Sequence, residues 1–374
     1  METLGLDTAV VTAPGLARAL EEGWTLPARW YSDPEIERLE RERIFRRTWQ
    51  YVGRTAQVEE PASYFTSTAG HIPVVVVRDR EGELRGFVNV CRHRGHLVAQ
   101  GEGCRETLQC PYHAWTYGLD GSLRKAPRSE REAGFDPGAF SLLPIAVDTW
   151  GPFVFANPDP EAAPLAETLG ELPSFIAASG LDLDALRFHS HYEWEIGVNW
   201  KVAIENYLEC YHCPVAHPSF SKVIDVDPDA YELRTSPTFS SQFGPVRASA
   251  LEGNGSAPYD ARGDVTQAQY HLIWPSTTIN IDPGPQNISI ERWLPVGAGK
   301  TIEVTDYLLG PEVTEETAQA MIAFGTQVAT EDVALCESVQ AGLNSGMVPQ
   351  GRLMLQSEKL IAHFQRLVHG ALTG

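Results

Sequence analysis

The first regular pattern along the chain is a stripe of apolar positions at helical spacing. Within residues 33–47, Ile36, Leu39 and Ile44 recur among charged residues, directly after an Asp-Pro pair. An Asp at the N-cap and a Pro at the first helical position are typical of a helix start. We therefore predict a short amphipathic helix here, within an N-terminal helical segment, residues 1–47, that packs on the C-terminal domain.

The pattern then changes to short strands. From Tyr51 to about Asn157, runs such as 73–77 and 85–90 have the composition of strands and are separated by Gly-rich turns. These features predict a small all-β domain at residues 48–158.

A third pattern follows a Pro-rich stretch at residues 157–164. A strong helix is predicted at 199–213, several strand-like runs lie between 232 and 309, and a long helical stretch covers about 312–343. We therefore expect a mixed domain at residues 159–374, so that the fold class of the whole chain is α+β.

Composition and charge narrow the possible functions. The 374 residues are 43% hydrophobic, which is enough for two domains with packed cores. The 49 acidic and 29 basic side chains leave a formal charge of −20, which repels nucleic acids and anionic membranes. No stretch has the length of a membrane span or the layout of a secretion signal, so we expect a cytoplasmic protein. Six cysteines in such a chain indicate metal binding rather than disulfides.

Two of these cysteines belong to a pair of mixed Cys–His motifs. Cys91 and His93 form C-x-H, and after sixteen intervening residues Cys110 and His113 form C-x-x-H. Each loop then places one thiolate and one imidazole. A Rieske [2Fe–2S] cluster needs this division, with two Cys on one iron and two His on the other. A structural zinc site is the alternative, but zinc sites usually pair cysteines in one motif and histidines in another.

A second group of metal ligands is predicted at the end of the helix at 199–213. Asn199 is a good N-cap, and His212 lies on the stripe next to the core-facing one. Because Cys213 precedes a proline, the helix should end there and leave His217 in the following loop. Two histidines so placed can bind one ion at adjacent positions. A 2-His-1-carboxylate site also needs one carboxylate ligand.

The best candidate for that carboxylate is Asp332. It shares one face of the predicted long helix with three apolar residues, Val328, Leu335 and Val339. An acidic residue on such a face needs a cation or several donors to offset its desolvation. The alternatives are a solvated charge on an exposed face, and Glu331, one residue earlier, as the ligand.

The same region contains Cys210 and Cys213 in a C-x-x-C spacing. That spacing can indicate thioredoxin-like redox chemistry, but the expected βαβ context is missing and a predicted iron ligand lies between the two cysteines. We therefore interpret both cysteines as small packing residues.

With both motifs in place, the sequence resembles the α-subunits of Rieske non-haem iron oxygenases, also called ring-hydroxylating oxygenases. The resemblance covers nearly the whole chain. Its most specific stretches, 206–213 and 216–218, look most like the branch that includes the carnitine, betaine and choline monooxygenases. The resemblance implies a Rieske β-domain and a catalytic helix-grip (START/Bet v1-like) domain built on an antiparallel sheet. One departure is the segment 354–360, which is shorter and lacks the Gly-rich tract of carnitine-type enzymes.

The resemblance also implies roles for residues and partners. Glu209 would bridge His212 to His113 of a neighbouring subunit, so a homotrimer is expected, and Glu209 and Asn199 are the candidate catalytic residues. The implied cofactors are the Rieske [2Fe–2S] cluster and a mononuclear Fe(II), with O₂ as co-substrate. Electrons would come from NAD(P)H through a flavin/iron–sulfur reductase or a ferredoxin. Residues 85–131 hold eight Lys or Arg against four Asp or Glu, and we expect this patch to dock an acidic donor.

The expected reaction is hydroxylation, or oxidative demethylation with C–N cleavage, of a small substrate of the quaternary ammonium or betaine type. A cation of this kind calls for an aromatic cage. The candidate substrate-binding residues are Tyr207, Tyr270, Trp274 and Trp293. Two alternatives stay open: an oxygenase for aromatic-ring dihydroxylation or aryl O-demethylation, and a Rieske electron carrier fused to an inert second domain.

Overall fold

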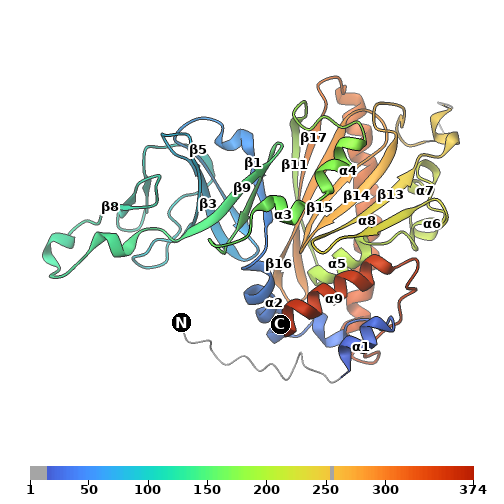
Figure 1. The fold of residues 1–374 in the computed structure, drawn as a ribbon, viewed down its shortest axis with the longest axis horizontal. Coiled ribbons are helices and arrows are strands. Elements are labelled where there is room, and N and C mark those ends of the chain that lie inside the picture. Colours follow the sequence, from blue (N-terminus) through green and yellow to red (C-terminus); the bar gives the residue numbers. More distant parts are fainter. Residues whose placement is uncertain (1–14, 253–256) are drawn as a thin grey trace. The chain divides into compact units, whose positions relative to one another are not determined.

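The structure is a computed structural model that describes residues 15–252 and 257–374. Two compact units divide the chain (Figure 1): one is Phe45–Glu167, and the other combines the residues up to Ile44 with Thr168–Gly374. The N-terminal helical segment, as far as it is described, therefore belongs mostly to the same unit as the C-terminal region. Among the described residues, no helix is both long enough and apolar enough to cross a membrane.

The Phe45–Glu167 unit is a β-domain and extends somewhat beyond the predicted limits of 48–158. Its seven-stranded antiparallel sheet has the order β1-β10-β9-β4-β3-β2-β5, and a three-stranded sheet has the order β6-β7-β8. The strands of the large sheet are β1 (Gln50–Arg54), β2 (Ser63–Ala69), β3 (Ile72–Arg78), β4 (Leu84–Val88), β5 (Glu102–Cys104), β9 (Pro144–Trp150) and β10 (Phe153–Asn157). The strands of the small sheet are β6 (Leu108–Gln109), β7 (Thr116–Tyr117) and β8 (Leu123–Lys125).

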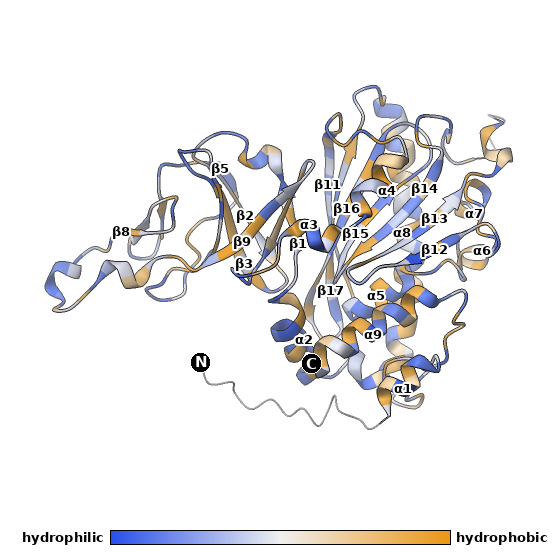
Figure 2. Ribbon diagram, viewed as in Figure 1, coloured by the Kyte–Doolittle hydropathy of each residue, from blue (hydrophilic) through white to orange (hydrophobic). Residues whose placement is uncertain are grey.

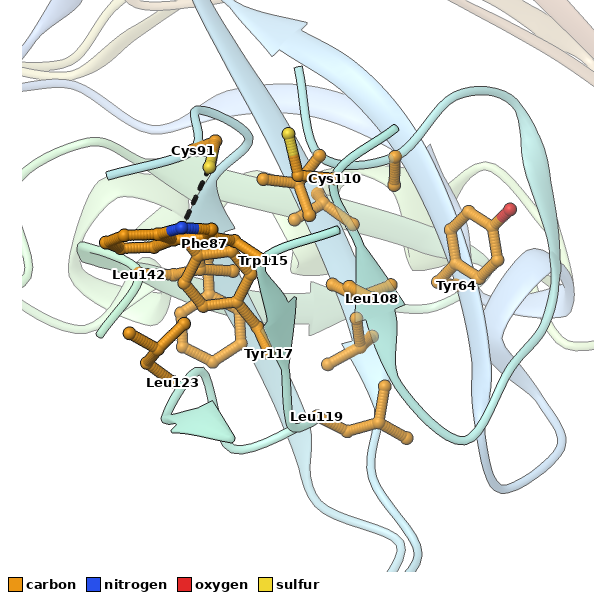
Figure 3. Close-up of a cluster of buried hydrophobic side chains, with 14 residues drawn as sticks. Tyr64, Phe87, Cys91, Leu108, Cys110, Trp115, Tyr117, Leu119, Leu123 and Leu142 are labelled. Atoms are coloured by element: carbon orange, nitrogen blue, oxygen red, sulfur yellow. Dashed lines mark hydrogen bonds between the residues drawn. The ribbon is translucent and has the colours of Figure 1, made fainter. Parts of the chain in front are cut away.

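The interior strand β3 is buried on both faces. Its four consecutive valines, Val74–Val77, are inaccessible to solvent. Because side chains alternate across a strand, the even-numbered valines pack into one hydrophobic cluster and the odd-numbered valines into another. The second cluster is drawn in Figure 3, where Cys91 and Cys110 lie at one end and Leu119 and Leu123 at the other. The two cysteines of the Cys–His motifs are therefore packed against buried apolar residues.

The other unit is built on a seven-stranded antiparallel sheet with the order β11-β17-β16-β15-β14-β13-β12. Its strands are β11 (Arg187–Ile196), β12 (Glu232–Thr235), β13 (Phe239–Pro245), β14 (Gln267–Ile273), β15 (Thr277–Ile281), β16 (Asn287–Gly297) and β17 (Lys300–Leu309). The α-helices of the described chain are α1 (Leu16–Glu21), α2 (Pro34–Glu40), α3 (Leu165–Leu169), α4 (Leu172–Ala178), α5 (Trp200–Tyr207), α6 (Cys213–Ala216), α7 (Phe220–Val223), α8 (Glu315–Asn344) and α9 (Lys359–Thr373). Short 3₁₀ turns cover Ala28–Tyr31, Thr55–Val58, Ser129–Arg131, Pro137–Phe140 and Ala248–Leu251, and a π-helical turn covers Arg41–Phe45.

This second sheet has one apolar and one polar face. On β16, Ile288 and Ile290 are fully buried on one face, whereas Ser289, Glu291 and Trp293 line a cavity on the other. Figure 2 shows the resulting mixture of hydrophilic and hydrophobic residues along these strands. The 30-residue helix α8 faces the polar side, since residues of the helix and of the strands line the same cavity. An antiparallel sheet covered by a long helix is the helix-grip arrangement, and the predicted fold class is therefore confirmed.

A buried ion pair joins the N-terminal segment to α5. Lys201 Nζ contacts the Glu40 carboxylate, and both side chains are fully buried. Glu40 also accepts a hydrogen bond from Trp200 Nε1 at 2.8 Å. Burial raises the pKa of Glu40, and the Lys201 charge offsets part of that rise. Each charge therefore depends on the other for its stability in the interior.

Replacing Lys201 with Met should destabilise this unit by about 3–5 kcal/mol, because Glu40 is left buried without its counter-charge. The free energy of unfolding, measured by urea denaturation, reports the effect. The double variant Lys201→Met/Glu40→Leu should recover most of the loss, since no charge then remains buried. Arg18→Ala, which removes an exposed ion pair with Glu22, is the control and should change the free energy by less than about 1 kcal/mol. Equal stability of the single and double variants would contradict this account.

Candidate metal centres and the adjoining cavity

Two loops of the β-domain carry the four predicted cluster ligands, and both loops have the same backbone design. The Cys91 N–H donates to the carbonyl of His96 at 2.8 Å, and the Cys110 N–H donates to that of Trp115 at 2.8 Å. Each loop therefore closes five residues after its cysteine. A residue with left-handed backbone makes the tight turn four positions after each cysteine, as at Gly95 with a φ of 75°.

The loops bury their sulfur atoms and expose their imidazoles. Cys91 and Cys110 are 3% and 1% exposed, whereas His93 and His113 are exposed to solvent. The two imidazole rings lie 4.6 Å apart between centroids. Burial, together with the neighbouring Cys91 thiol, raises the pKa of the Cys110 thiol. Two thiols at the buried end and two imidazoles at the exposed end fit a [2Fe–2S] cluster whose His-bound iron lies outermost.

The helix predicted at 199–213 is wrong in its second half. α5 ends at Tyr207 and α6 begins at Cys213, so that His212 lies in the turn between the two helices. The reason is that the Glu209 carboxylate accepts the backbone N–H of His212 at 3.2 Å, and also that of the residue before it. A side chain that binds nearby backbone N–H groups in this way competes with the helical hydrogen bonds.

Two smaller predictions for this region also need correction. Cys210 and Cys213 form a disulfide across the turn, so they are not free packing residues. Asn199 is the N-cap of α5, and its side-chain oxygen accepts the Lys201 N–H at 3.0 Å. Its amide donates to the carbonyl of Ala298 at 2.6 Å, and it does not line the cavity described below. The structure therefore gives Asn199 a structural role rather than the catalytic one that was expected.

Three possible ligand atoms lie close together in the triad formed by His212, His217 and Asp332. His217 Nε2 lies 3.0 Å from His212 Nε2 and 2.9 Å from Asp332 Oδ1, and His212 Nε2 lies 3.4 Å from the same oxygen. Ligand atoms that are about 2.1 Å from an ion and at right angles to one another are about 3.0 Å apart. The three atoms therefore fit one face of an octahedral iron site, which leaves the opposite positions open.

Two glutamates fix the orientation of the imidazoles. Glu209 contacts Nδ1 of His212, and Glu331 lies 2.7 Å from Nδ1 of His217. Each Nδ1–H is thus donated to a carboxylate, which leaves Nε2 free to bind a metal. Glu331, the alternative ligand of the sequence analysis, therefore supports His217 instead of completing the triad.

The charges in the triad favour a cation at its centre. Burial opposes ionisation of Asp332, but hydrogen bonds with His212 and His217 lower its pKa to about 2. Burial likewise opposes protonation of His212, but its bonds with Asp332 and Glu209 raise its pKa to about 9. Asn206, which no spacing rule singled out, donates its amide to Asp332 Oδ1 at 3.0 Å and so helps to hold the carboxylate. The site thus concentrates negative charge that a divalent cation would neutralise.

A cavity of about 200 Å³ adjoins the triad. Three of the candidate substrate-binding residues, Tyr207, Tyr270 and Trp293, line it together with the triad. Trp274 does not line it, because it packs on Phe364 with a ring-centroid distance of 5.7 Å. Six aromatic residues that the sequence analysis did not select also line the cavity, namely Tyr192, Trp194, Phe220, Tyr231, Tyr307 and Phe324.

Two protein families match this chain over consecutive regions. Residues 48–146 match the Rieske [2Fe-2S] domain, and residues 183–374 match the ring hydroxylating alpha subunit (catalytic domain). The chain belongs to the ring-hydroxylating oxygenase α-subunit family. It is therefore a Rieske non-haem iron oxygenase, the oxygenase subunit of a multicomponent enzyme, with a Rieske cluster and a mononuclear iron as cofactors. This membership excludes a Rieske carrier with an inert second domain.

Relatives of this oxygenase subunit are identical to it at about a third of the aligned positions. The carnitine monooxygenase oxygenase subunit of Acinetobacter pittii is 33% identical over 92% of this chain and 94% of its own. The chloroplastic choline monooxygenase of Amaranthus tricolor is 34% identical over 94% of this chain and 78% of its own. One solved structure is that of a quaternary ammonium Rieske monooxygenase, and it was described for its insights into carnitine oxidation and inter-subunit electron transfer. It matches this chain with a TM-score of 0.82 and 31% identity, over 96% of this chain and 98% of its own.

Replacing Asp332 with Ala should empty the mononuclear site of this oxygenase and leave the Rieske cluster in place. Two imidazoles alone hold iron weakly, whereas the Cys–His motifs belong to the other unit. Metal and acid-labile sulfide analysis should fall from about three to about two iron atoms per two sulfides, with an unchanged visible spectrum of the cluster.

The matched control for this variant is Glu337→Ala, which removes an exposed acid from the same helix and should keep all of the iron. An Asp332→Ala protein that retains its full iron content would refute the choice of ligand.

Proposed function

We propose that this oxygenase subunit oxidises a small quaternary ammonium substrate, by hydroxylation or by oxidative demethylation with C–N cleavage. The observation that carries this proposal is the wall of the cavity beside the triad. Among the described residues that line it, seven are Tyr or Trp and none is Lys or Arg. Aromatic faces attract a poorly hydrated cation, and a wall without basic groups offers nothing to neutralise an anion. The relatives named for carnitine and choline support this substrate class.

Each part of the two centres has a role in this proposal. The residues that hold the Rieske cluster are Cys91, His93, Cys110 and His113, and those that hold the iron are His212, His217 and Asp332. Iron bound in this way supplies the reductive activation of O₂. Glu209 and Glu331 keep both Nε2 atoms directed at the metal position, and the aromatic wall holds the substrate beside it.

Oxidation of an aromatic ring or an aryl ether is the alternative reaction. A neutral aromatic substrate calls for an apolar slot, but Glu291 and Glu303 line this cavity and are only 9% and 8% exposed. Buried carboxylates beside a neutral hydrocarbon would remain without a counter-charge. The quaternary ammonium substrate is therefore favoured over the aromatic one.

The proposed electron path crosses a subunit boundary. Glu209 holds His212 of the mononuclear site, and the neighbouring Tyr211 and Val215 are 62% and 87% exposed. Exposed apolar side chains that lie together are typical of an interface. The exposed His113 of another copy would approach Glu209 here, which requires a symmetric oligomer, and we favour a homotrimer. The relative described with inter-subunit electron transfer supports this path.

The proposed electron donor is a flavin/iron–sulfur reductase or a ferredoxin that takes its electrons from NAD(P)H. In the β-domain, Arg124, Lys125 and Arg128 are exposed on one short segment. Such a segment attracts an acidic donor and speeds its association. We place the reaction in the cytoplasm, because NAD(P)H and a reductase are available there.

Substrate-dependent consumption of NADH and O₂ by the holoenzyme with a matching reductase tests the proposed reaction. At least one quaternary ammonium compound among choline, carnitine and glycine betaine should stimulate consumption, because the aromatic wall binds its cation. Product analysis by mass spectrometry then shows whether an N-substituent is lost. Stimulation by methoxylated or carboxylated aromatic compounds alone would replace this proposal with the aromatic alternative.

Glu209→Gln should leave both metals bound but slow electron transfer to the mononuclear site. The amide keeps the size of the side chain and removes the charge that holds His212. We expect a loss of about 10–100-fold in the reoxidation rate of the reduced cluster, measured by stopped-flow absorbance with O₂ and substrate.

The matched control for the electron path is Glu331→Gln, which changes the carboxylate behind His217 instead of the one behind His212. In the iron-loaded fraction of this control the reoxidation rate should be retained. The path through Glu209 is wrong if Glu209→Gln reoxidises as fast as the wild type.

A further inference from the structure

Three carboxyl groups stand on the sheet side of the cavity beside the triad. Asp282 follows β15, Glu291 lies on β16 and Glu303 lies on β17. Glu291 is opposite Thr305 in the register of the sheet, and Glu303 is opposite Trp293. The two glutamates are therefore diagonal neighbours on one face. Together with Asp282 they are the acidic residues on the sheet side of the cavity, and we call these three residues the acidic wall.

Glu303 is the member of this wall whose hydrogen bonding is incomplete. Its side chain is 8% exposed, its Oε1 accepts a hydrogen bond from Thr305 at 3.2 Å, and its buried Oε2 has no hydrogen-bond partner. In contrast, both oxygens of Glu291 are occupied, by Thr278 and Asn280, each at 2.7 Å. Burying a polar atom without a hydrogen-bond partner is unfavourable. The free oxygen of Glu303 therefore calls for a donor that the chain itself does not supply.

No basic side chain offsets the acidic wall. None of the cavity-lining residues in the described part of the chain is Lys or Arg. Burial raises the pKa of Glu291 to about 7 and that of Glu303 to about 8, and the charge of Glu291 adds to the rise at Glu303. A cationic ligand would stabilise the charged forms of these acids. The charged wall is then complementary to the cation and repels a carboxylate.

We infer that Glu303, supported by Glu291, selects a substrate that combines a quaternary ammonium with a hydrogen-bond donor and carries no carboxylate. This inference rests on the proposed function of the same cavity. The donor, a hydroxyl or an N–H, binds the free oxygen of Glu303, while the ammonium lies among the aromatic rings. A zwitterion would instead place its carboxylate beside the acids that its own ammonium brings into their charged forms.

The relatives do not decide between these two kinds of substrate. One is named for carnitine, which is a zwitterion, and another for choline, which is a cation with a hydroxyl group. Both are about equally similar to this chain, at 33% and 34% identity. The charge of the cavity wall is therefore the property of this chain that distinguishes between a zwitterionic and a cationic substrate.

Three probes on the holoenzyme test the inference: choline, tetramethylammonium and glycine betaine. Isothermal titration calorimetry of the oxidised protein gives Kd, and NADH and O₂ consumption with a reductase gives kcat/KM. Choline should bind most tightly, and tetramethylammonium more weakly because it lacks the donor. Glycine betaine should bind about a hundredfold or more weakly than choline, because of the repulsion between like charges.

Glu303→Gln is the deciding variant. The amide keeps the size of the side chain but removes its charge, so choline affinity should fall by about tenfold or more and the preference over glycine betaine should shrink. Glu291→Gln should change the preference in the same direction, and it keeps the test valid if Glu303→Gln does not fold. The matched control is Glu193→Gln, the same substitution at an exposed position of β11, which should leave the preference unchanged.

The possible failures can be told apart. Equal affinity for choline and glycine betaine in the wild type, or an unchanged preference in both cavity variants, would overturn selection by Glu303 but leave a quaternary ammonium oxygenase. If no probe binds or is turned over while an aromatic compound is, the proposed function fails and this inference fails with it.

Discussion

The contact of Asp332 with His212 and His217 is the interaction on which the rest of the site depends. It joins α8 to the turn after α5, and the Asp332–His217 part spans 115 positions of the sequence. It also holds α8 over the polar face of the sheet. Because protein interiors are closely packed, a cavity persists only where its walls do not pack against each other. The triad and the acidic wall are two such polar surfaces, so their charged groups help to keep the cavity open.

Local spacing explains why the sequence alone was informative about the metal ligands. Each cysteine of the β-domain closes its own loop with a hydrogen bond five residues ahead, so C-x-H and C-x-x-H set where thiol and imidazole stand. The end of α5 could not be predicted in the same way. There the Glu209 side chain takes the backbone N–H of His212, and a stripe of residue types does not show that a side chain competes with the helix.

The acidic wall was hidden from sequence reasoning for a different reason. Glu291 and Glu303 alternate with buried aliphatic residues, and such alternation normally indicates a strand with one face in water. Only α8, which comes from a distant part of the chain, turns that outer face into the wall of a cavity. The opposite error concerns Leu335 and Val339, which were expected on a buried face with Asp332 but are 40% and 51% exposed. Periodicity shows which residues share a face, but not what covers it.

The two sides of the cavity differ in how their acidic groups are balanced. On the helix side, the divalent iron that the triad would hold is balanced by Asp332 and by the carboxylates of Glu209 and Glu331 behind the imidazoles. On the sheet side, Asp282, Glu291 and Glu303 have no Lys or Arg among the described lining residues to balance them. A cationic substrate therefore finds its counter-charge on the sheet side, which leaves the open coordination positions to O₂. A neutral aromatic compound would not be oriented in this way. The charge asymmetry that selects a cation thus also places it, and this explains why the acidic wall and the triad face each other across one cavity.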